Sequence, residues 1–420
     1  MKKMLKTLLL ISMIVLTGCG VQETLPLVSD SNYYINYEMK YYYGEEGETF
    51  TIDLEKDFFS EGIIVSYYND EITNLRDKYD SFELYVKLID NKPVGYDYKI
   101  IDDFKAEVTF LDGNYPLYCR LINTKENKCS KAMLLGYTYV KQKDYIEVNS
   151  FEDLLQEENW YTTISNKTFI LNKDLDFNDY QGVINVNKVK SLEGCTILNP
   201  NNYVIRNLDF KDEIELGIQN NRNIGLYNEL NECYFDNLIF ENVTYNFDAY
   251  DIESTSYIMA SILGNRAIDC VFKNIKVNSL NVTINGLKAE NRCEISGLVR
   301  ITSDVAFVNN SINMNVIQTG EVGDYNGLPT QIVAGLASHL TPLSASDSNE
   351  LYYGKNIYNY KRFSTRYNVV RGKIQGIDVI GGLFGVERHG RYYINEYNDI
   401  DIDMISQTNN IGEIYGVSKI

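Results

Sequence analysis

A glycine-hydrophobic signature recurs along the second half of this chain and constrains its fold more than any other feature. It reads Ile-Gly-Leu-Tyr at 224–227, Ser-Gly-Leu-Val at 296–299 and Gly-Gly-Leu-Phe-Gly at 381–385. Six copies are present, and one equivalent residue in each serves as a marker. Successive markers lie 36, 36, 38, 47 and 31 residues apart. Such spacing is typical of stacked repeats, which predicts a solenoid with a long exposed surface rather than a closed pocket. The markers are Gly225, Ser261, Gly297, Gly335, Gly382 and Glu413.

The composition indicates a folded, strand-rich protein. The 420 residues are 44% hydrophobic and include 35 tyrosines, a residue type that favours pleated, half-buried surfaces. The formal net charge of −19 repels nucleic acid and anionic lipid head groups. We therefore expect no nucleic-acid partner, and no motif in the sequence indicates a cofactor.

The N-terminus has the pattern of an export signal. Three lysines within the first six residues precede an apolar run at 8–16, which is too short to span a bilayer permanently. The sequence Leu16-Thr17-Gly18-Cys19 resembles a bacterial lipobox. The resemblance implies a signal peptide at 1–18, diacylglycerol on the Cys19 thiol and a tether at 19–31. We therefore expect an extracytoplasmic protein that is anchored to the membrane at the cell surface through this lipid.

Residues 32–146 alternate apolar and polar side chains in short runs, as at 49–54 and 82–88. Turn-forming residues separate these runs, which predicts a small all-β, sandwich-like domain. Cys119 and Cys129 flank a polar stretch that is typical of a hairpin loop. Because an exported location permits disulfides, this pair is a candidate bridge.

The segment 147–420 is expected to form the solenoid. Ser150 and Asp153 have the spacing of a helix capping box, and the apolar residues at 151, 154 and 155 lie on one helical face. Such a helix can cover the first coil, whose strand edges are otherwise unpaired. A small residue recurs at one position of the coils that follow, and the expected equivalents are Cys233, Cys270 and Ala306. Each is followed by a pair of polar residues whose second member is asparagine. This pattern predicts inward-facing cysteines and stacked asparagines in turns.

Residues 150–420 resemble the GLUG-repeat class of bacterial surface proteins. The likeness rests on Asp174-Leu175-Asp176, on 192–195 and on Asn202-Tyr203-Val204-Ile205, followed by the repeats. The sequence departs from that class at Pro200-Asn201-Asn202, where a glycine-flanked turn is usual. The resemblance implies a right-handed parallel β-helix on an extracellular protein, often beside adhesive or protease modules. It says little about activity, since function belongs to sites rather than folds.

An enzyme on this fold would need clustered carboxylates or a basic residue beside bound calcium. The chain has two histidines, His339 and His389, and neither lies in a recognisable catalytic motif. Asp399, Asp401 and Asp403 alternate along one predicted strand, so their side chains point to the same face. They are candidates for a metal site or for catalysis. The alternative is the solvated face of a strand whose residues 400, 402 and 404 point inward.

The interval between Gly335 and Gly382 is about ten residues longer than its neighbours, and extra length in a repeat maps to a loop. This loop concentrates tyrosine and basic residues in an otherwise acidic protein, which favours contact with sugars or a protein. The alternative is that these side chains pack the loop onto the coil. The candidate ligand-binding residues are Tyr352, Tyr353, Tyr358, Tyr360, Arg362, Arg366 and Tyr367.

Together these features predict an all-β protein: a right-handed parallel β-helix preceded by a small β-sandwich-like domain. We expect a lipid-anchored cell-surface solenoid that acts in adhesion, ligand binding or scaffolding, with a glycan or protein as its extracellular ligand. The alternative is a surface polysaccharide lyase or glycosidase. Because no closing helix follows the last repeat, self-association through an open C-terminal coil is a further expectation.

Overall fold

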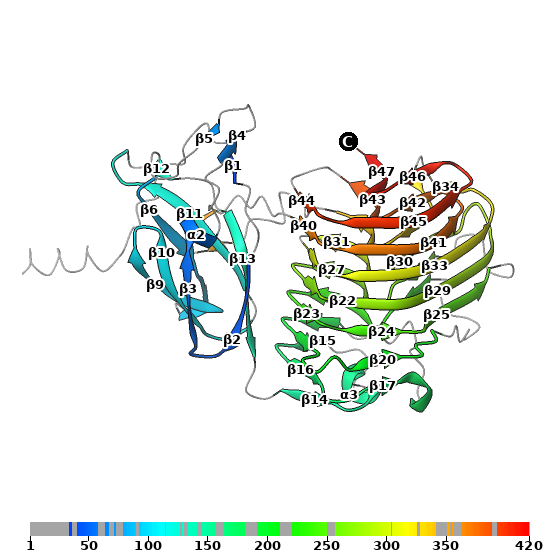
Figure 1. Ribbon diagram of the computed structural model, residues 1–420, viewed down its shortest axis with the longest axis horizontal. Helices are drawn as coiled ribbons and strands as arrows, with labels where there is room; N and C mark the ends of the chain where they lie inside the picture. The colour runs from blue at the N-terminus through cyan, green and yellow to red at the C-terminus, as the bar shows by residue number, and fades with distance from the viewer. Residues whose placement is uncertain are drawn as a thin grey trace, which may run out of the picture.

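Two β-rich units lie side by side in the computed structural model, an N-terminal module and a larger solenoid (Figure 1). Strands dominate both units, and the long sheets of the solenoid are entirely parallel, which confirms the predicted fold class. The structure describes residues 33–35, 40–57, 64–66, 71–72, 79–89, 92–113, 115–126, 128–129, 133–141, 145–156, 163–180, 191–210, 221–249, 257–303, 305–325, 328–341, 351–352, 355–356, 363–388 and 393–419.

The N-terminal module is built from two sheets whose apolar faces share one core. Its strands alternate buried and exposed residues, as in Lys105–Phe110, because one face of each sheet packs inward. One sheet has the order β3 (Thr49–Asp53), β10 (Lys105–Phe110), β9 (Tyr96–Asp102). The other has the order β12 (Lys128–Cys129), β11 (Tyr115–Asn123), β13 (Met133–Lys141), β2 (Lys40–Glu45), with β6 (Ser81–Tyr85) on β11. Outside these two sheets, β1 (Tyr33–Ile35), β4 (Ile64–Ser66) and β5 (Glu71–Ile72) form a small three-stranded sheet, and β7 (Lys87–Ile89) pairs with β8 (Lys92–Val94). The short helix α2 is Leu54–Asp57.

From β21 onward each coil of the solenoid passes through four parallel sheets, named A to D here in the order in which the chain visits them, and the described strands of the earlier coils belong to sheets B, C and D. Sheet A is β21 (Asn221–Ile224), β26 (Tyr257–Ala260), β30 (Arg292–Ser296), β36 (Gln331–Ala334), β42 (Val379–Gly381), β46 (Asn410–Gly412). Sheet B is β15 (Thr163–Ser165), β18 (Ser191–Glu193), β22 (Tyr227–Asn231), β27 (Gly264–Ile268), β31 (Val299–Ser303), β37 (Ala337–Leu340), β43 (Phe384–Arg388), β47 (Tyr415–Lys419).

Sheets C and D complete each coil. Sheet C is β14 (Ile146–Val148), β16 (Thr168–Leu171), β19 (Thr196–Leu198), β23 (Tyr234–Asp236), β28 (Val271–Lys273), β32 (Ala306–Val308), β40 (Phe363–Arg366), β44 (Tyr393–Glu396). Sheet D is β17 (Leu175–Asp176), β20 (Val204–Arg206), β24 (Ile239–Glu241), β29 (Lys276–Leu287), β33 (Ser311–Gly320), β41 (Val369–Gly376), β45 (Asp399–Ser406), with β25 (Val243–Asp248) on β29. Two hairpins leave the coils, β34–β35 (Asp324–Tyr325, Leu328–Pro329) and β38–β39 (Leu351–Tyr352, Lys355–Asn356).

The recurring glycines form the corner between sheets A and B. A Cβ on Gly297 would lie 2.1 Å from the carbonyl oxygen of Gly335, and one on Gly335 would lie 2.1 Å from that of Gly382. Each glycine therefore lets the backbone of the next coil approach closely, which explains why the signature recurs once per coil.

Like side chains stack inside the coils. The rings of Phe235 and Phe272 lie 5.1 Å apart between centroids, and those of Phe272 and Phe307 lie 5.4 Å apart. The expected cysteine column is also present, because Cys195, Cys233 and Cys270 are fully buried. Burial raises the pKa of the Cys195 thiol to about 12, so this thiol is protonated at neutral pH. The next member of the column is Val305, not Ala306 as expected, because Ala306 aligns with Val271 on the opposite face of sheet C.

The first coil is covered as predicted. Helix α3 (Phe151–Leu155) begins after Ser150, whose hydroxyl accepts a hydrogen bond of 3.2 Å from the Asp153 N–H. The Asp153 carboxylate accepts in turn from the Asn149 N–H. The Phe151 ring packs edge-on against Phe177 of the 3-10 helix Phe177–Asp179. These apolar side chains close the solenoid core at this end, where Figure 1 places α3.

The N-terminal module packs against the outer face of sheet C. The ring of Tyr139 in β13 stacks on that of Tyr234 in β23, with 4.2 Å between centroids. Tyr234, Val271 and Ala306 belong to the core of the module rather than to that of the solenoid. The module is therefore docked on the coils through a buried apolar contact.

The predicted disulfide is wrong for this structure, because Cys119 is a free, buried thiol. The expected hairpin does form between β11 and β12, but Cys129 lies opposite Ile122. Cys119 instead lies opposite Leu84 and Met133. The two cysteines thus occupy different positions along their strands, and burial raises the pKa of the Cys119 thiol well above its ordinary value.

Candidate functional site

Most of the predicted ligand-binding segment lies outside the described residues. This applies to Tyr353, Tyr358, Tyr360 and Arg362, as it does to the lipidation residue Cys19. The backbone of Tyr352 belongs to the short strand β38. The remaining two candidates, Arg366 and Tyr367, have described side chains and define the region considered below.

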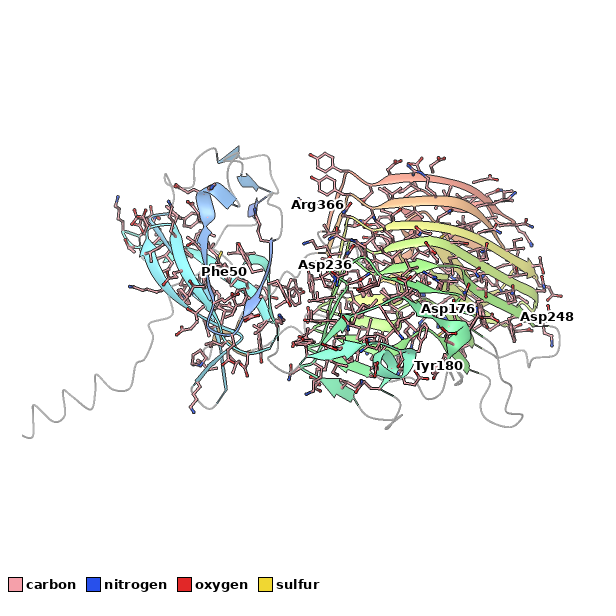
Figure 2. The ribbon with its side chains drawn as sticks, turned by 60° about the horizontal axis from the view of Figure 1, so that its bottom comes forward. Phe50, Asp176, Tyr180, Asp236, Asp248 and Arg366 are labelled. Carbon is pink, nitrogen blue, oxygen red and sulfur yellow. The ribbon has the colours of Figure 1, made fainter. Side chains whose placement is uncertain are left out.

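Arg366 and Tyr367 differ in their access to solvent. Arg366 ends β40 on sheet C and is only 5% exposed, so the structure contradicts its expected role as a surface contact. The reason is its place on the sheet C face, which turns toward the N-terminal module, as Figure 2 shows for Arg366 and Asp236. Tyr367 follows at the corner between sheets C and D and is 44% exposed.

Tyr367 is paired with a second exposed tyrosine one coil further along. Its ring lies parallel to that of Tyr397, with 5.2 Å between centroids and an interplanar angle of 6°. Tyr397 is 73% exposed, the largest value among the large apolar and aromatic residues that the structure describes as exposed. The two rings form an aromatic surface at the corner of the solenoid, called the tyrosine pair below.

The backbone of the tyrosine pair is in an unusual conformation. Tyr367 and Tyr397 have φ angles of 57° and 55°, in the left-handed region. The same corner in earlier coils is occupied by Asn237, Asn274 and Asn309, with φ angles of 61°, 55° and 55°. Asparagine tolerates this region because its side chain bonds locally, whereas a bulky residue there costs about 1–2 kcal/mol. The earlier coils thus confirm the predicted asparagine turns, and the tyrosines stand where asparagine is the easier residue.

A buried amide ladder holds the backbone directly behind the tyrosine pair. The Asn368 side chain donates to the Asn398 carboxamide oxygen (2.8 Å) and to the carbonyl of Phe307 (2.9 Å). Asn398 donates to the carbonyl of Thr365 (2.9 Å). This ladder fixes the position from which each ring projects. The predicted stacking of turn asparagines is confirmed in the earlier coils, where the Asn309 side chain donates to the Asn274 carboxamide oxygen (2.7 Å).

The three aspartates alternate along β45 as predicted, with Ile400, Ile402 and Met404 packed toward the core. Asp399 pairs with Arg371 of β41, and Asp403 lies 3.6 Å from the Lys373 ammonium. This arrangement fits a solvated strand face with cations on the neighbouring strand. Among the described residues no group of three or more His, Cys, Asp or Glu side chains is placed to hold a metal ion.

These aspartates also bear on self-association, which stays a prediction. β45 is the last strand of sheet D within the described part of the chain. The side chains of Asp399, Asp401 and Asp403 are 62%, 84% and 64% exposed. Exposed like charges along an edge strand oppose pairing with the same edge of a second copy.

A buried charge cluster that no sequence motif indicated lies between sheets A and B. Glu294 of β30 is fully buried, and its carboxylate lies 3.1 Å from both the Arg300 guanidinium and the His339 imidazole. Arg292 pairs with the other carboxylate oxygen. Burial alone would raise the pKa of Glu294, but His339, Arg300 and Arg292 together outweigh it and hold the pKa far below its ordinary value. A carboxylate that stays ionised and enclosed in this way is suited to holding the corner together.

Sequence reasoning also missed Tyr397. The available signal was the recurrence of Tyr-Asn at 367–368 and 397–398, each followed by a strand and each preceded by a charged residue. This recurrence could be recognised as a stacked pair only after the coils had been aligned, because the equivalent position one coil before Tyr367 is an asparagine, Asn309.

None of the helices in the described residues is long and apolar enough to cross a bilayer. Comparisons with protein-family models and with curated proteins found no match to this chain.

Proposed function

We propose that this protein is a lipid-anchored, cell-surface binding protein whose solenoid presents the tyrosine pair to an extracellular glycan. The observation that carries the proposal is the exposed stack of Tyr367 and Tyr397 in a costly backbone conformation. Residues held in such conformations cluster at ligand-binding sites, where strain is tolerated for the sake of function.

The chemistry around the tyrosine pair suits a sugar. Aromatic faces accept the C–H groups of a pyranose ring, and tyrosine adds a hydroxyl at its edge. Asp399, two residues beyond Tyr397, and its partner Arg371 supply hydrogen-bonding groups beside the rings. Because the rings project from a corner fixed by buried amides, little side-chain or backbone freedom is lost on binding. A protein ligand would use the same aromatic surface, and it is the second arm of the test below.

Two features of the sequence support the cell-surface location. The lipobox-like sequence ending at Cys19 would place a diacylglycerol anchor ahead of the N-terminal module. The resemblance of residues 150–420 to GLUG-repeat proteins favours an extracellular role in adhesion or scaffolding. The alternative, a polysaccharide lyase or glycosidase, requires carboxylates that converge with a base. Asp399, Asp401 and Asp403 lie beside Arg371 and Lys373, so an enzyme would act on this face of sheet D, and the test below includes sugar release.

The test is a Tyr397→Asn variant, which restores the residue type of the earlier coils. Loss of the ring stack lowers the free energy of unfolding by about 0.5–1.5 kcal/mol. Asparagine raises it by about as much, because it adopts the left-handed backbone conformation more easily than tyrosine does. We therefore expect thermal stability close to that of the unchanged protein, with glycan affinity reduced about tenfold or more. Binding is measured on a glycan array and on cells with the soluble chain lacking residues 1–19.

Two control variants make the result specific. Tyr397→Phe keeps the ring and is expected to retain most of the affinity. Tyr145→Asn removes another exposed tyrosine, 44% exposed, away from this corner and should have no effect on binding. Unchanged glycan and cell binding by Tyr397→Asn would sink the proposal. Release of reducing or unsaturated sugar by the unchanged protein would instead favour the enzyme.

A further inference from the structure

The outer face of sheet D extends directly from the tyrosine pair. The two longest strands that the structure describes, β29 with 12 residues and β33 with 10, belong to this sheet, and Figure 1 shows them stacked with β41 and β45. Residues of β33 alternate between the core and the outside, so each strand adds one row of side chains to the outer face. Tyr367 and Tyr397 lie two residues before the first residues of β41 and β45. The tyrosine pair therefore stands at the edge of this face, where its strands begin.

The central rows of the face are rich in carboxamides and carry no charge. After Lys276, the outward positions that asparagine does not occupy in β29 and β33 hold serine, threonine or isoleucine. Charged residues make up 23% of the whole chain and normally lie at the surface, so an uncharged area stands out here. Asparagine is also disfavoured in strands, and its repeated use at outward positions indicates a role besides folding. The asparagines are Asn278, Asn281, Asn285, Asn313 and Asn315, and they are called the amide face below.

Hydrogen bonds orient some of these carboxamides and leave others unused. Asn285 donates to the Asp248 carboxylate (2.9 Å), at the far end of the face that Figure 2 labels, and Asn281 donates to the Ser279 hydroxyl (2.9 Å). Asn315 is exposed, and its side chain makes no hydrogen bond to any other residue that the structure describes. Asn281 and Asn315 lie in register on neighbouring strands, about 4.8 Å apart. The face thus presents donors and acceptors to solvent at a regular spacing.

We infer that the amide face is the platform on which a neutral, β-1,4-linked polysaccharide of the cellulose or chitin type lies. A carboxamide both donates and accepts, so it can pair with a sugar hydroxyl in either direction. The β-1,4 linkage gives an extended ribbon, whose hydroxyls can meet rows of side chains along a sheet. The inference rests on the proposed glycan-binding function, and it names the class of glycan and the surface that continues from the tyrosine pair.

The charges around the amide face select against acidic polysaccharides. Its rows offer no cation to a uronate or a sulfate group. Arg371 and Lys373 on the neighbouring strand β41 already lie beside Asp399 and Asp403. The net charge of −19 also repels a polyanion as a whole.

The test compares neutral with acidic polysaccharides. The full-length chain in a polyoxyethylene detergent is mixed with particles of cellulose, of chitin or of cross-linked polygalacturonate, and the protein left in solution is measured. We expect saturable binding to cellulose or chitin, at least about tenfold tighter than to polygalacturonate and not weakened by added salt, since ion pairs do not contribute. Tighter binding to polygalacturonate would overturn the inference, as would the absence of saturable binding to both neutral polymers.

Two substitutions in one column then locate the site. Asn281→Val combined with Asn315→Val removes two carboxamides, and binding to the neutral polymer should fall at least about tenfold because their hydrogen bonds are lost. Valine forms strands more readily than asparagine, so thermal stability should not fall. Asn228→Val combined with Asn231→Val, on β22 of sheet B, is the matched control and should bind as the unchanged chain does. Unchanged binding by the variant with both sheet D substitutions would overturn the assignment.

The variants also separate this inference from the proposed function. Loss of binding in both Tyr397→Asn and the sheet D variant is the expected result. Loss in Tyr397→Asn alone would reject the amide face and leave the tyrosine pair as the glycan site. Loss in the sheet D variant alone would reject the tyrosine pair and keep the amide face.

Discussion

Glu294→Gln is expected to lower the free energy of unfolding by about 3–5 kcal/mol, the usual cost of breaking a buried ion pair. The substitution keeps the size of the side chain but leaves Arg300 and His339, which are 11% and 2% exposed, without their carboxylate. These groups link β30 to β31 and to β37 of the next coil, so their loss weakens the corner between sheets A and B.

The same carboxylate predicts how stability depends on pH. The folded protein holds the pKa of Glu294 well below its ordinary value, whereas in the unfolded chain the group titrates near about 4.3. The unfolded state therefore binds more protons around that pH, and stability must rise with pH there. The contribution is present above about pH 4.3 and is lost as the pH falls below it.

Urea unfolding followed by far-UV circular dichroism, at neutral pH and at several acidic values, measures both effects. The unchanged protein should lose more stability than Glu294→Gln as the pH falls from about 5 to 3. Glu229→Gln alters an exposed glutamate on β22 and is the control, with an expected change within about 0.5 kcal/mol. A neutral-pH loss below about 1 kcal/mol for Glu294→Gln would show that the cluster contributes little.

Cys19→Ala is expected to release the protein from the membrane almost completely. A single myristoyl-type chain binds a bilayer weakly, with a constant of about 10⁴ M⁻¹, whereas two or more chains give stable attachment. Removing the thiol that would carry diacylglycerol should therefore remove the main membrane affinity.

Phase partition with a cloud-point detergent, together with metabolic labelling by a radioactive fatty acid, measures this result. The unchanged chain should carry label and enter the detergent phase. Cys19→Ala should lose the label and remain in the aqueous phase. Ser31→Ala, beyond the expected tether, is the control and should behave as the unchanged chain. Membrane association of unlabelled Cys19→Ala would refute the lipid anchor.

The coil architecture was predictable because each coil requires a particular residue type at the same position, and these residues recur in the sequence. Gly297, Gly335 and Gly382 have no room for a Cβ, so the backbone contact between coils leaves a direct mark on the sequence. The asparagine turns and the buried cysteines leave the same kind of mark. The alignment of residues between coils was harder to predict. An error of one residue assigned Ala306 to the buried position that Val305 occupies, and in a strand such a shift moves a side chain to the opposite face of the sheet.

The functional residues were harder to predict because they depend on contacts between coils. Tyr397 became a candidate only when its ring was seen to lie against Tyr367. Glu294 and His339 belong to different sheets and different coils, so no local motif joins them. The disulfide failed for a related reason: loop length suggested that Cys119 and Cys129 are neighbours, whereas strand register separates them.

The stacking of coils, on which the binding surface depends, is tested most directly by a distance between nitroxide labels at Asn246 and Ile405. Both residues are exposed and lie in one column of sheet D, which runs from β25 through β29, β33 and β41 to β45. Four strand steps of about 4.8 Å predict a narrow distribution near about 19 Å between the two backbones. Labels introduced through a bio-orthogonal side chain leave the native thiols untouched, and double electron–electron resonance reads the distance. A shift of the first label to Thr283 should shorten it by about 5 Å, one strand step. A broad distribution, or one centred beyond about 30 Å, would contradict the stacked coils, because no parallel register could then join these strands.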